Sequence, residues 1–300
     1  MKDVEIIRDV NLQDYNTYGI GGRAKYLILP KSIQELQNVL KELKEKNISW
    51  YILGNGSNVI LPDEDYNGAI IKLDNIHDFY VCNDIISADA GISLSTFVNK
   101  MIEKEYINYA PLMGIPGTLG GALVGNAGVK KCTIYDYLID IKVLDNDGVI
   151  KTYKKEDINY SYRNTEFKEN NKIILGATFK GVKGDVKEAK EQIKNNLTDR
   201  RNTQPLDCKN AGSVFKNPKE YYAGALIEQA GLKGMQVGDA QVSFKHANFI
   251  INLGNAKSSD IINLISEIKR KVKKEYNIDL ELEQIIVKWW STWQIIKRKK

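Results

Sequence analysis

The sequence predicts an α+β protein, because strand-like and helix-like segments follow one another without a repeating strand–helix–strand order. Residues 259–276 place apolar side chains at helical spacing, which predicts an amphipathic helix. Residues 138–144 and 149–153 flank an Asn-Asp-Gly turn, the pattern of a β-hairpin. Helices and strands are therefore expected in one chain, and no internal repeat organises them.

The other elements follow from the same local signals. Ser32 and Glu35 form a capping box after Pro30 and begin a helix with an apolar stripe. Gly231 is placed to end a later helix. A polar, cationic segment at 199–205 predicts a domain boundary. Further strands are predicted at 49–53, 68–73, 85–90, 172–179, 249–253 and 278–287, and further helices at 93–101, 186–196 and 223–230.

Composition excludes several classes of protein. The 300 residues are enough for two or three domains. The net charge of +5 comes largely from the last four residues, so no nucleic-acid partner is expected. Three separated cysteines and two histidines predict reduced thiols in a cytoplasmic protein and no metal site. The first ten residues carry acids among their apolar side chains, so no signal peptide is expected there. Residues 106–129 carry no charge, but their glycines and prolines predict buried loops rather than a membrane helix.

Two glycine-rich segments are candidates for binding a ligand's phosphates. Glycine lets backbone N–H groups approach a diphosphate closely. Val59 stands where a Rossmann fingerprint needs its third glycine, and no Lys-Ser/Thr pair makes a Walker A loop. A tight turn remains open for the first segment, and close backbone packing for the second. The candidates are Gly54, Asn55, Gly56, Ser57 and Asn58, then Gly114, Ile115, Pro116, Gly117, Gly120, Gly121 and Ala122.

An ordered set of motifs resembles the UDP-N-acetylenolpyruvoylglucosamine reductase family of bacterial cell-wall synthesis. The length is similar to that of the shorter, type II members. The motifs are Asn16-Thr17, GGRA (21–24), LGNGSN (53–58), GIPGTLGGA (114–122), NAG (126–128), SYRN (161–164), AGSVFKNP (211–218), LIEQAGLKG (226–234), SFKHANFIIN (243–252) and LELE (280–283).

The resemblance implies a two-part FAD-binding fold of the vanillyl-alcohol-oxidase type and a C-terminal α+β substrate-binding domain. FAD is expected to rest its diphosphate on the two glycine loops, and NADPH to be the co-substrate. A UDP-sugar is expected as the other substrate, with a monomer or weak oligomer and no stable membrane insertion. The expected parts are FAD-binding subdomains 1–73 and 74–197, the second joined by a strand at 279–290, a substrate domain at 198–278 and a basic tail at 291–300.

The resemblance also assigns the chemistry, in which hydride from reduced flavin adds to an enolpyruvyl ether and leaves an enolate. Arg163 is expected to hold the enolate with its forked guanidinium. Glu283 is expected to help in protonated form, with a pKa raised by burial and by the substrate's charge. Ser213 is expected to give the proton. Tyr162, Lys216 and Asn217 are candidate substrate contacts.

From the residues alone, each of these assignments has a plain structural alternative. Arg163 is compatible with a surface position at a strand end, Ser213 with a turn and Glu283 with the solvated face of a strand. His246 is interpreted as structural. Relatives often carry arginine where Ile285 stands, and the Trp/Lys-rich tail has no counterpart, so packing or a membrane surface remains open for it. The rival functions are another FAD-dependent sugar or lactone oxidase and a non-catalytic nucleotide-binding module.

Overall fold

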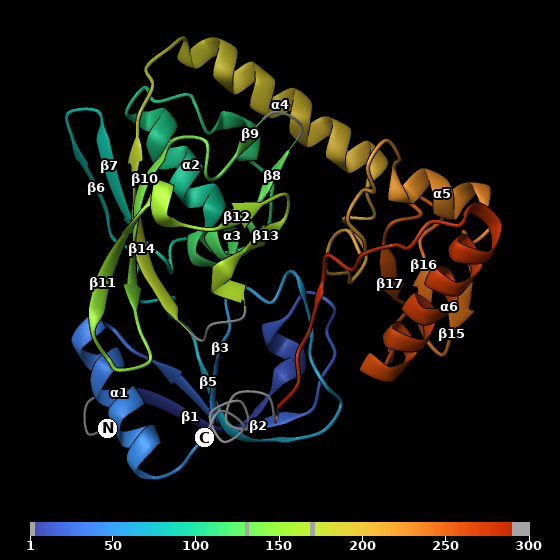
Figure 1. Ribbon diagram of the computed structural model, residues 1–300, viewed down its shortest axis with the longest axis horizontal. Coiled ribbons are helices and arrows are strands. Elements are labelled where there is room, and N and C mark those ends of the chain that lie inside the picture. Colours follow the sequence, from blue (N-terminus) through green and yellow to red (C-terminus); the bar gives the residue numbers. More distant parts are fainter. Residues whose placement is uncertain (1–3, 130–131, 169–171, 290–300) are drawn as a thin grey trace. The chain divides into compact units, whose positions relative to one another are not determined.

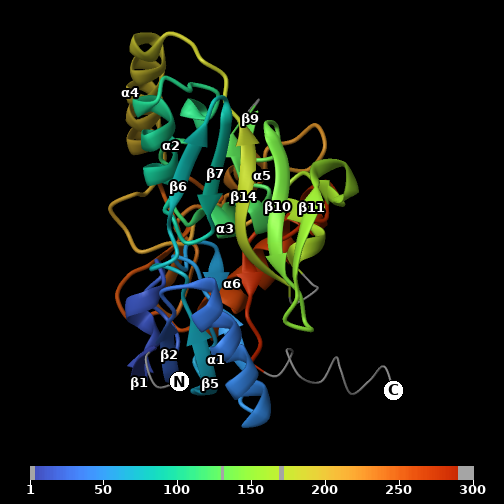
Figure 2. The same cartoon turned by 90° about the vertical axis from the view of Figure 1, so that its left-hand side faces the viewer.

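The computed structural model describes residues 4–129, 132–168 and 172–289 (Figures 1 and 2). It divides into two compact units, each with its own hydrophobic core. Unit 1 takes its described residues from 1–8, 26–55 and 68–198, and unit 2 from 9–25, 56–67 and 199–300.

Helices and strands are mixed along the chain, as the α+β prediction requires. The α-helices are α1 (Ile33–Glu45), α2 (Leu94–Glu103), α3 (Leu119–Gly125), α4 (Val186–Thr203), α5 (Ala223–Gln229) and α6 (Ser258–Tyr276). The strands are β1 (Glu5–Asn11), β2 (Arg23–Leu29), β3 (Trp50–Ile52), β4 (Val59–Ile60), β5 (Tyr66–Ile71), β6 (Phe79–Cys82), β7 (Ile85–Asp89), β8 (Gly128–Val129), β9 (Cys132–Thr133), β10 (Leu138–Leu144), β11 (Ile150–Lys154), β12 (Tyr160–Ser161), β13 (Asn164–Thr165), β14 (Ile173–Lys180), β15 (Gln236–Val237), β16 (Ala240–Val242), β17 (Ile250–Asn252) and β18 (Ile285–Ile286).

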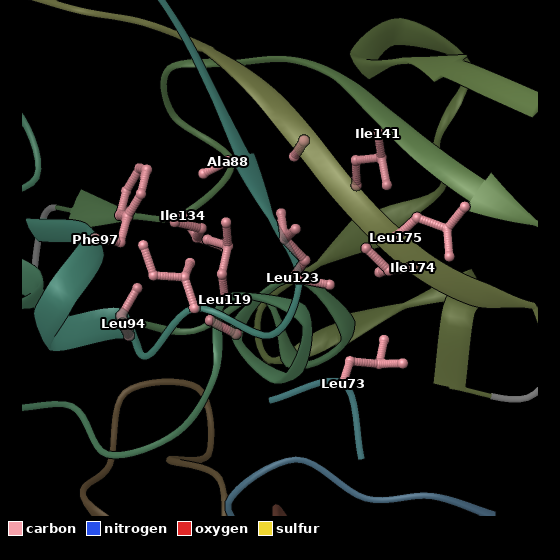
Figure 3. Packing of buried hydrophobic residues seen from close by; sticks show 14 of the residues in the cluster. Leu73, Ala88, Leu94, Phe97, Leu119, Leu123, Ile134, Ile141, Ile174 and Leu175 are labelled. Atoms are coloured by element: carbon pink, nitrogen blue, oxygen red, sulfur yellow. The ribbon is translucent and has the colours of Figure 1, made fainter. Parts of the chain in front are cut away.

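Unit 1 is built on a five-stranded antiparallel sheet with the order β11-β10-β14-β7-β6. The predicted hairpin is confirmed, because β10 and β11 pair from Leu144 opposite Ile150 to Asp140 opposite Lys154. Apolar side chains of α2 and α3 pack against this sheet (Figure 3). The side chains drawn there include Leu73, Ala88, Leu94, Phe97, Leu119, Leu123, Ile134, Ile141, Ile174 and Leu175.

A second sheet has the order β1-β2-β5-β3. Strands β3 and β5 run parallel, with Ile52 opposite Ile71, so their carboxyl ends meet at one edge. Helix α1 begins as predicted, because the Ser32 hydroxyl accepts a hydrogen bond from the Glu35 amide at 3.1 Å. The edge where β3 and β5 end therefore carries the first glycine loop.

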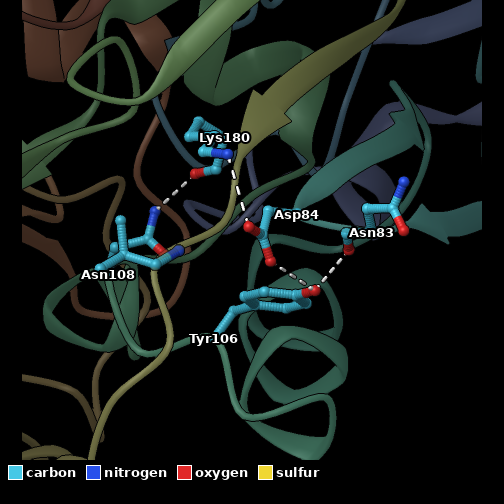
Figure 4. Close-up of polar contacts among 6 residues, drawn as sticks. Asn83, Asp84, Tyr106, Asn108 and Lys180 are labelled. Atoms are coloured by element: carbon cyan, nitrogen blue, oxygen red, sulfur yellow. Dashed lines mark hydrogen bonds and ion pairs between the residues drawn. The ribbon is translucent and has the colours of Figure 1, made fainter.

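Polar contacts fix the segment after α2 against the large sheet (Figure 4). The Tyr106 hydroxyl donates to Asp84 Oδ1 at 3.4 Å and to the Asn83 carbonyl. Asp84 pairs with Lys180 Nζ at 3.5 Å, and Asn108 Nδ2 donates to the Lys180 carbonyl at 3.1 Å. The uncharged stretch that begins at Tyr106 is thus folded into loops and short helices. Within the described ranges, no helix has the length and apolar character needed to span a membrane.

Unit 2 packs α5 and α6 with the antiparallel sheet β15-β16-β17. Helix α6 confirms the predicted amphipathic segment, because its apolar stripe is buried. Helix α5 ends at Gln229 with Ala230 as its cap, and Gly231 follows with a φ of +70°, the conformation that favours glycine after a helix. The buried stripe of α6 consists of Ile261, Leu264, Ile265, Ile268 and Val272.

Two predictions need correction. The helix predicted at 186–196 is too short, because α4 continues to Thr203 and ends only where Pro205 disfavours helical backbone before it, so the segment 199–205 is largely helical. The division between the two units nevertheless falls beside it, between residues 198 and 199. The strand predicted at 278–287 is reduced to β18, which pairs in parallel with β4 and not with a strand of 74–197. The residues before β18 bond to an irregular segment instead, since Lys216 N donates to the Glu281 carbonyl at 2.9 Å.

Candidate active site

The start of the first glycine loop, at Gly54, approaches the second loop within unit 1. A Cβ atom added at Gly54 would lie 2.9 Å from Thr118 Oγ1, in the second loop. The Thr118 hydroxyl in turn accepts from the Gly121 amide at 3.2 Å and caps α3. Gly120 packs its backbone on Ala90, with its amide 2.8 Å from the Ala90 carbonyl. Close backbone packing therefore accounts for Gly120. The absence of a side chain at Gly54 allows the first loop to approach Thr118 in the second loop.

Gly56 is required by the fold itself. Its φ is +64°, and an added Cβ would collide with the Tyr15 carbonyl oxygen and lie 2.5 Å from Asn16 Cα. Its carbonyl accepts from the Thr17 amide at 3.2 Å. A valine at Gly56 would therefore disrupt this loop whether or not a diphosphate binds there. The predicted ligand Asn58 bonds within unit 2, because Nδ2 donates to the Glu283 carbonyl at 3.3 Å.

Lys72 is a residue of this region that sequence reasoning missed. Its side chain is only 8% exposed, and its ammonium donates to the Gly54 carbonyl at 2.6 Å. Asp74, a half-exposed carboxylate, lies 3.4 Å from the same nitrogen. The available signal was its place directly after β5, because β3 and β5 end at the same edge. A buried positive charge therefore stands directly at the first glycine loop.

Arg163 occupies a constrained position in the turn between β12 and β13. Its φ is +56°, which a non-glycine residue rarely adopts. Its guanidinium donates to the Asn126 carbonyl at 3.1 Å and also to the Gly128 carbonyl. The same guanidinium lies 5.2 Å from the Tyr162 ring centroid. The SYRN and NAG motifs are thus brought together, and Arg163 is not a solvated residue at a strand end.

Asn126 presents a buried acceptor beside Arg163. It ends α3 with a φ of +45°, and Nδ2 donates to the Ser161 carbonyl at 2.8 Å. Its Oδ1 atom is buried and has no hydrogen-bond donor among the residues that the structure describes. A buried amide oxygen normally has a donor, so this atom fits an N–H or O–H group of a bound ligand.

Ser213 and Glu283 lie on neighbouring segments of unit 2. Ser213 is half-buried and follows Gly212, whose φ of +74° turns the chain. The Glu283 amide donates to the Val214 carbonyl at 2.9 Å, so the two chain segments are directly bonded. The Val214 amide is held in turn by the Asn248 carbonyl at 2.9 Å. Arg163 belongs to unit 1, and its approach to this pair stays a prediction.

The two other candidates in this motif already have partners within unit 2. Lys216 Nζ pairs with the Glu281 carboxylate, and the lysine side chain is only 11% exposed. Asn217 Oδ1 accepts from the Ala223 amide at 3.0 Å, at the first residue of α5. Both side chains are therefore fixed in orientation, and their contact with substrate stays a prediction.

His246 is built into the structure, in agreement with its interpretation as structural. Its Nδ1 atom accepts from the Asn248 amide at 3.1 Å, and its ring meets Phe249 edge-on at 4.8 Å. Burial lowers the pKa of His246, and the charge of Lys233 lowers it further against the opposing charge of Glu228. The neutral imidazole is the form that can accept this hydrogen bond.

The lowered pKa of His246 predicts a pH dependence of stability. The native state binds the proton less tightly than the unfolded chain does, so stability is lost as the pH falls through the unfolded pKa. The free energy of unfolding should therefore fall more steeply from about pH 7 to about pH 5 in the natural chain than in His246→Gln. Urea unfolding at several pH values measures this. Parallel pH profiles of the two proteins would contradict it.

Trp289 packs within unit 2. Its ring stacks on Tyr66 with centroids 4.2 Å apart and an interplanar angle of 19°. Its indole N–H donates to the Glu64 carbonyl at 3.0 Å. Packing, one of the two alternatives for the tail, thus holds for this first tryptophan. The basic tail at 291–300 lies outside the described residues.

Comparison with known proteins agrees with this arrangement. A family model described as "FAD binding domain" matches residues 24–154, and one described as "UDP-N-acetylenolpyruvoylglucosamine reductase, C-terminal domain" matches residues 204–287. The predicted fold class, an FAD-binding part followed by a C-terminal α+β domain, is confirmed.

Individual relatives extend the similarity over nearly the whole chain. The UDP-N-acetylenolpyruvoylglucosamine reductase of Clostridium novyi is 37% identical over 94% of this chain and 92% of its own length. That of Caldicellulosiruptor saccharolyticus is 39% identical over 94% and 91%. The crystal structure of the reductase from Thermus caldophilus matches with a TM-score of 0.80 and 31% identity, covering 95% of this chain and 99% of that one. The chain belongs to the UDP-N-acetylenolpyruvoylglucosamine reductase family.

Proposed function

We propose that this chain reduces UDP-N-acetylglucosamine enolpyruvate to UDP-N-acetylmuramate with NADPH and bound FAD, in the synthesis of peptidoglycan precursors. Family membership over nearly the whole chain supports the reaction. The observation that supports the mechanism is the direct bonding of the segments that carry Ser213 and Glu283. The match at residues 204–287 favours this reductase over a sugar or lactone oxidase that shares only the flavin-binding part.

The residues present fit FAD as the resident cofactor. The diphosphate is proposed to bind at the loop 54–58 and at the start of the second loop, residues 114–118, because the amides of Gly120, Gly121 and Ala122 already donate within the chain. Lys72 places a buried positive charge at the first loop. The buried oxygen of Asn126 is an acceptor for a donor on the ring system or on the substrate. When bound, FAD supplies the hydride, which no protein side chain can donate.

Arg163 is proposed to hold the carboxylate of the substrate and the charge that develops on it. Its guanidinium is fixed by the carbonyls of Asn126 and Gly128, so its orientation is set before the substrate binds. A fixed donor costs no reorganisation when charge develops, and one such donor is typically worth about 3 kcal/mol in the transition state. Tyr162, stacked on the guanidinium, limits its movement further.

Ser213 and Glu283 are proposed to act on the enolate together. The Ser213 hydroxyl gives its proton to the enolate carbon, and solvent returns a proton to the serine. Glu283, protonated, donates a hydrogen bond to an enolate oxygen. The hydrogen bond from the Glu283 amide to the Val214 carbonyl joins the two segments that carry the Ser213 hydroxyl and the Glu283 carboxyl. Joint action of the two groups requires such a fixed arrangement.

Steady-state turnover tests the proposed reaction. The purified chain should be yellow and should oxidise NADPH only when UDP-N-acetylglucosamine enolpyruvate is present, faster than with NADH. Turnover of simple sugars with oxygen would support the oxidase instead, and a colourless protein that does not take up FAD would support a non-catalytic module. We further propose that the protein works on small molecules in the cytoplasm as a monomer or weak oligomer. Light scattering would measure the oligomeric state.

Replacing Lys72 by methionine removes the charged hydrogen bond that holds the Gly54 carbonyl, a bond of a kind worth about 1.5–3 kcal/mol. FAD binding should then weaken by roughly 10- to 100-fold, because the first glycine loop loses its fixed conformation and the positive charge beside it. Methionine keeps the length and apolar stem, so the fold should tolerate the change. Titration of apoprotein with FAD, followed by flavin fluorescence, measures the dissociation constant directly. Lys190→Met, on the exposed side of α4, is the matched control and should leave affinity unchanged. Equal affinity in both variants would exclude the role of Lys72.

A further inference from the structure

Gln284 is a buried amide that links three parts of unit 2. It is only 3% exposed. Its Nε2 atom donates to the Ala211 carbonyl at 3.0 Å and to the Gly212 carbonyl at 3.2 Å. Its Oε1 atom accepts from the Tyr18 hydroxyl at 3.1 Å. Both N–H groups and the oxygen of the amide are therefore engaged, and the two donors point at consecutive carbonyls directly before Ser213.

Tyr18 determines which way the Gln284 amide faces. The tyrosine is fully buried, and burial raises its pKa, so its hydroxyl keeps its proton and serves as the donor. Only the oxygen of Gln284 can accept that hydrogen, which directs the amide nitrogen to the loop. Tyr18 is itself fixed, because Asn252 Nδ2 donates to its carbonyl at 2.9 Å.

The two carbonyls that Gln284 holds define the direction of the Ser213 side chain. The Ala211 and Gly212 carbonyls belong to the peptide planes on either side of Gly212, whose φ is +74°. Glycine has a wide choice of backbone conformations, so this turn needs an outside constraint to stay in one of them. The second plane includes the Ser213 nitrogen, and the Val214 amide beyond the serine is held by the Asn248 carbonyl at 2.9 Å. The backbone is therefore held on both sides of the serine, which limits the direction of its side chain.

We propose that Gln284, oriented by Tyr18, is a positioning residue that aims the Ser213 hydroxyl at the reacting carbon. It does not touch the substrate. The inference rests on the proposed role of Ser213 as proton donor. This role explains why a polar residue, Gln284, is buried directly after Glu283. The Glu283 amide holds the Val214 carbonyl on one side of Ser213, and the Gln284 side chain holds the Gly212 carbonyl on the other.

Gln284→Leu is the first test, because leucine has a similar volume and no hydrogen bond. Flavin reduction by NADPH should stay within about twofold, while reoxidation by the UDP-sugar should slow by about 10- to 100-fold, as a small misplacement of a catalytic group does. The solvent deuterium isotope effect on reoxidation should rise. In a Ser213→Ala background the same change should have no further effect on reoxidation, because the group that Gln284 aims is then absent.

Two further variants keep the test open if Gln284→Leu does not fold. Tyr18→Phe should slow reoxidation by a few-fold while flavin reduction is unchanged. In Gln284→Glu, reoxidation should recover as the pH falls, because only a protonated carboxyl can donate to the Gly212 carbonyl. Ser258→Ala removes another buried hydroxyl of unit 2, one that accepts from the Asp63 amide, and should change stability alone.

The outcomes separate this inference from the proposed function. If Ser213→Ala slows reoxidation and Gln284→Leu, as a folded protein, does not, the positioning role is wrong and the proton donor stands. If Gln284→Leu slows both half-reactions equally, or slows the Ser213→Ala protein as much as the natural one, its effect does not act through the serine. If Ser213→Ala has no effect, the proposed role and this inference fail together.

Discussion

Replacing Ser213 by alanine is expected to slow reoxidation of the reduced flavin by the UDP-sugar by about 10²–10⁴-fold, the usual contribution of a positioned proton donor. Flavin reduction by NADPH should be unchanged, because the serine has no part in that half-reaction. The structure supports a specific effect. The serine follows a glycine with φ +74° and sits on a segment bonded to that of Glu283, so loss of one hydroxyl leaves the backbone bonds of both segments intact.

Stopped-flow absorbance of the flavin measures both half-reactions of the Ser213→Ala protein. Ser213→Cys is the matched control, because a thiol of similar size can still give a proton and should restore part of the reoxidation rate. Equal slowing of the two half-reactions would assign the serine to cofactor binding or folding. An unchanged reoxidation rate would mean that the proton comes from another group, and Glu283 would be the next residue to replace.

The parts of the fold that the sequence predicted well are those whose signals are local. Ser32 and Ser93 cap α1 and α2 as expected, because a capping hydroxyl and the amide three residues on are close in the chain. The stripe of α6 is likewise visible as a spacing within one segment. The strand at 278–287 was predicted too long, because its first residues alternate apolar and acidic side chains as a strand does. The segment opposite them, around Val214, is irregular and forms few of the backbone hydrogen bonds that define a strand.

The candidate site likewise has parts that local sequence signals predict and parts that they do not. The glycine loops and the SYRN and AGS motifs are continuous stretches and could be found. The contacts that support them join residues far apart in sequence, such as Tyr18 and Gln284, which are 266 positions apart, or Lys72 and Gly54. No periodicity or motif marks such pairs. Gly56 was found by its motif and assigned to ligand binding, but the nearby backbone of Asn16 leaves no space for a side chain there even without a ligand.

Arg163→Lys is expected to lower the rate of flavin reoxidation by about 10²–10³-fold, the loss typical of one preorganised donor. Lysine keeps the charge but not the planar fork, so it cannot bond the Asn126 and Gly128 carbonyls and still present a fixed N–H edge to a carboxylate. Both side chains carry a Cβ atom, so the strain of φ +56° is the same in the two proteins. A difference in rate therefore reports the guanidinium and not the backbone.

The half-reactions of Arg163→Lys, followed with varied UDP-sugar, give the measurement, and thermal unfolding checks the turn. Lys168→Met is the control for the turn, because Lys168 donates to the Arg163 carbonyl at 2.7 Å without sharing its guanidinium contacts. A weaker affinity for the UDP-sugar with an unchanged limiting rate would make Arg163 a binding residue, since uniform binding does not lower the barrier. A lower limiting rate at saturating substrate is what stabilisation of the enolate requires, because the enolate charge is absent from the bound substrate and develops as the hydride is transferred.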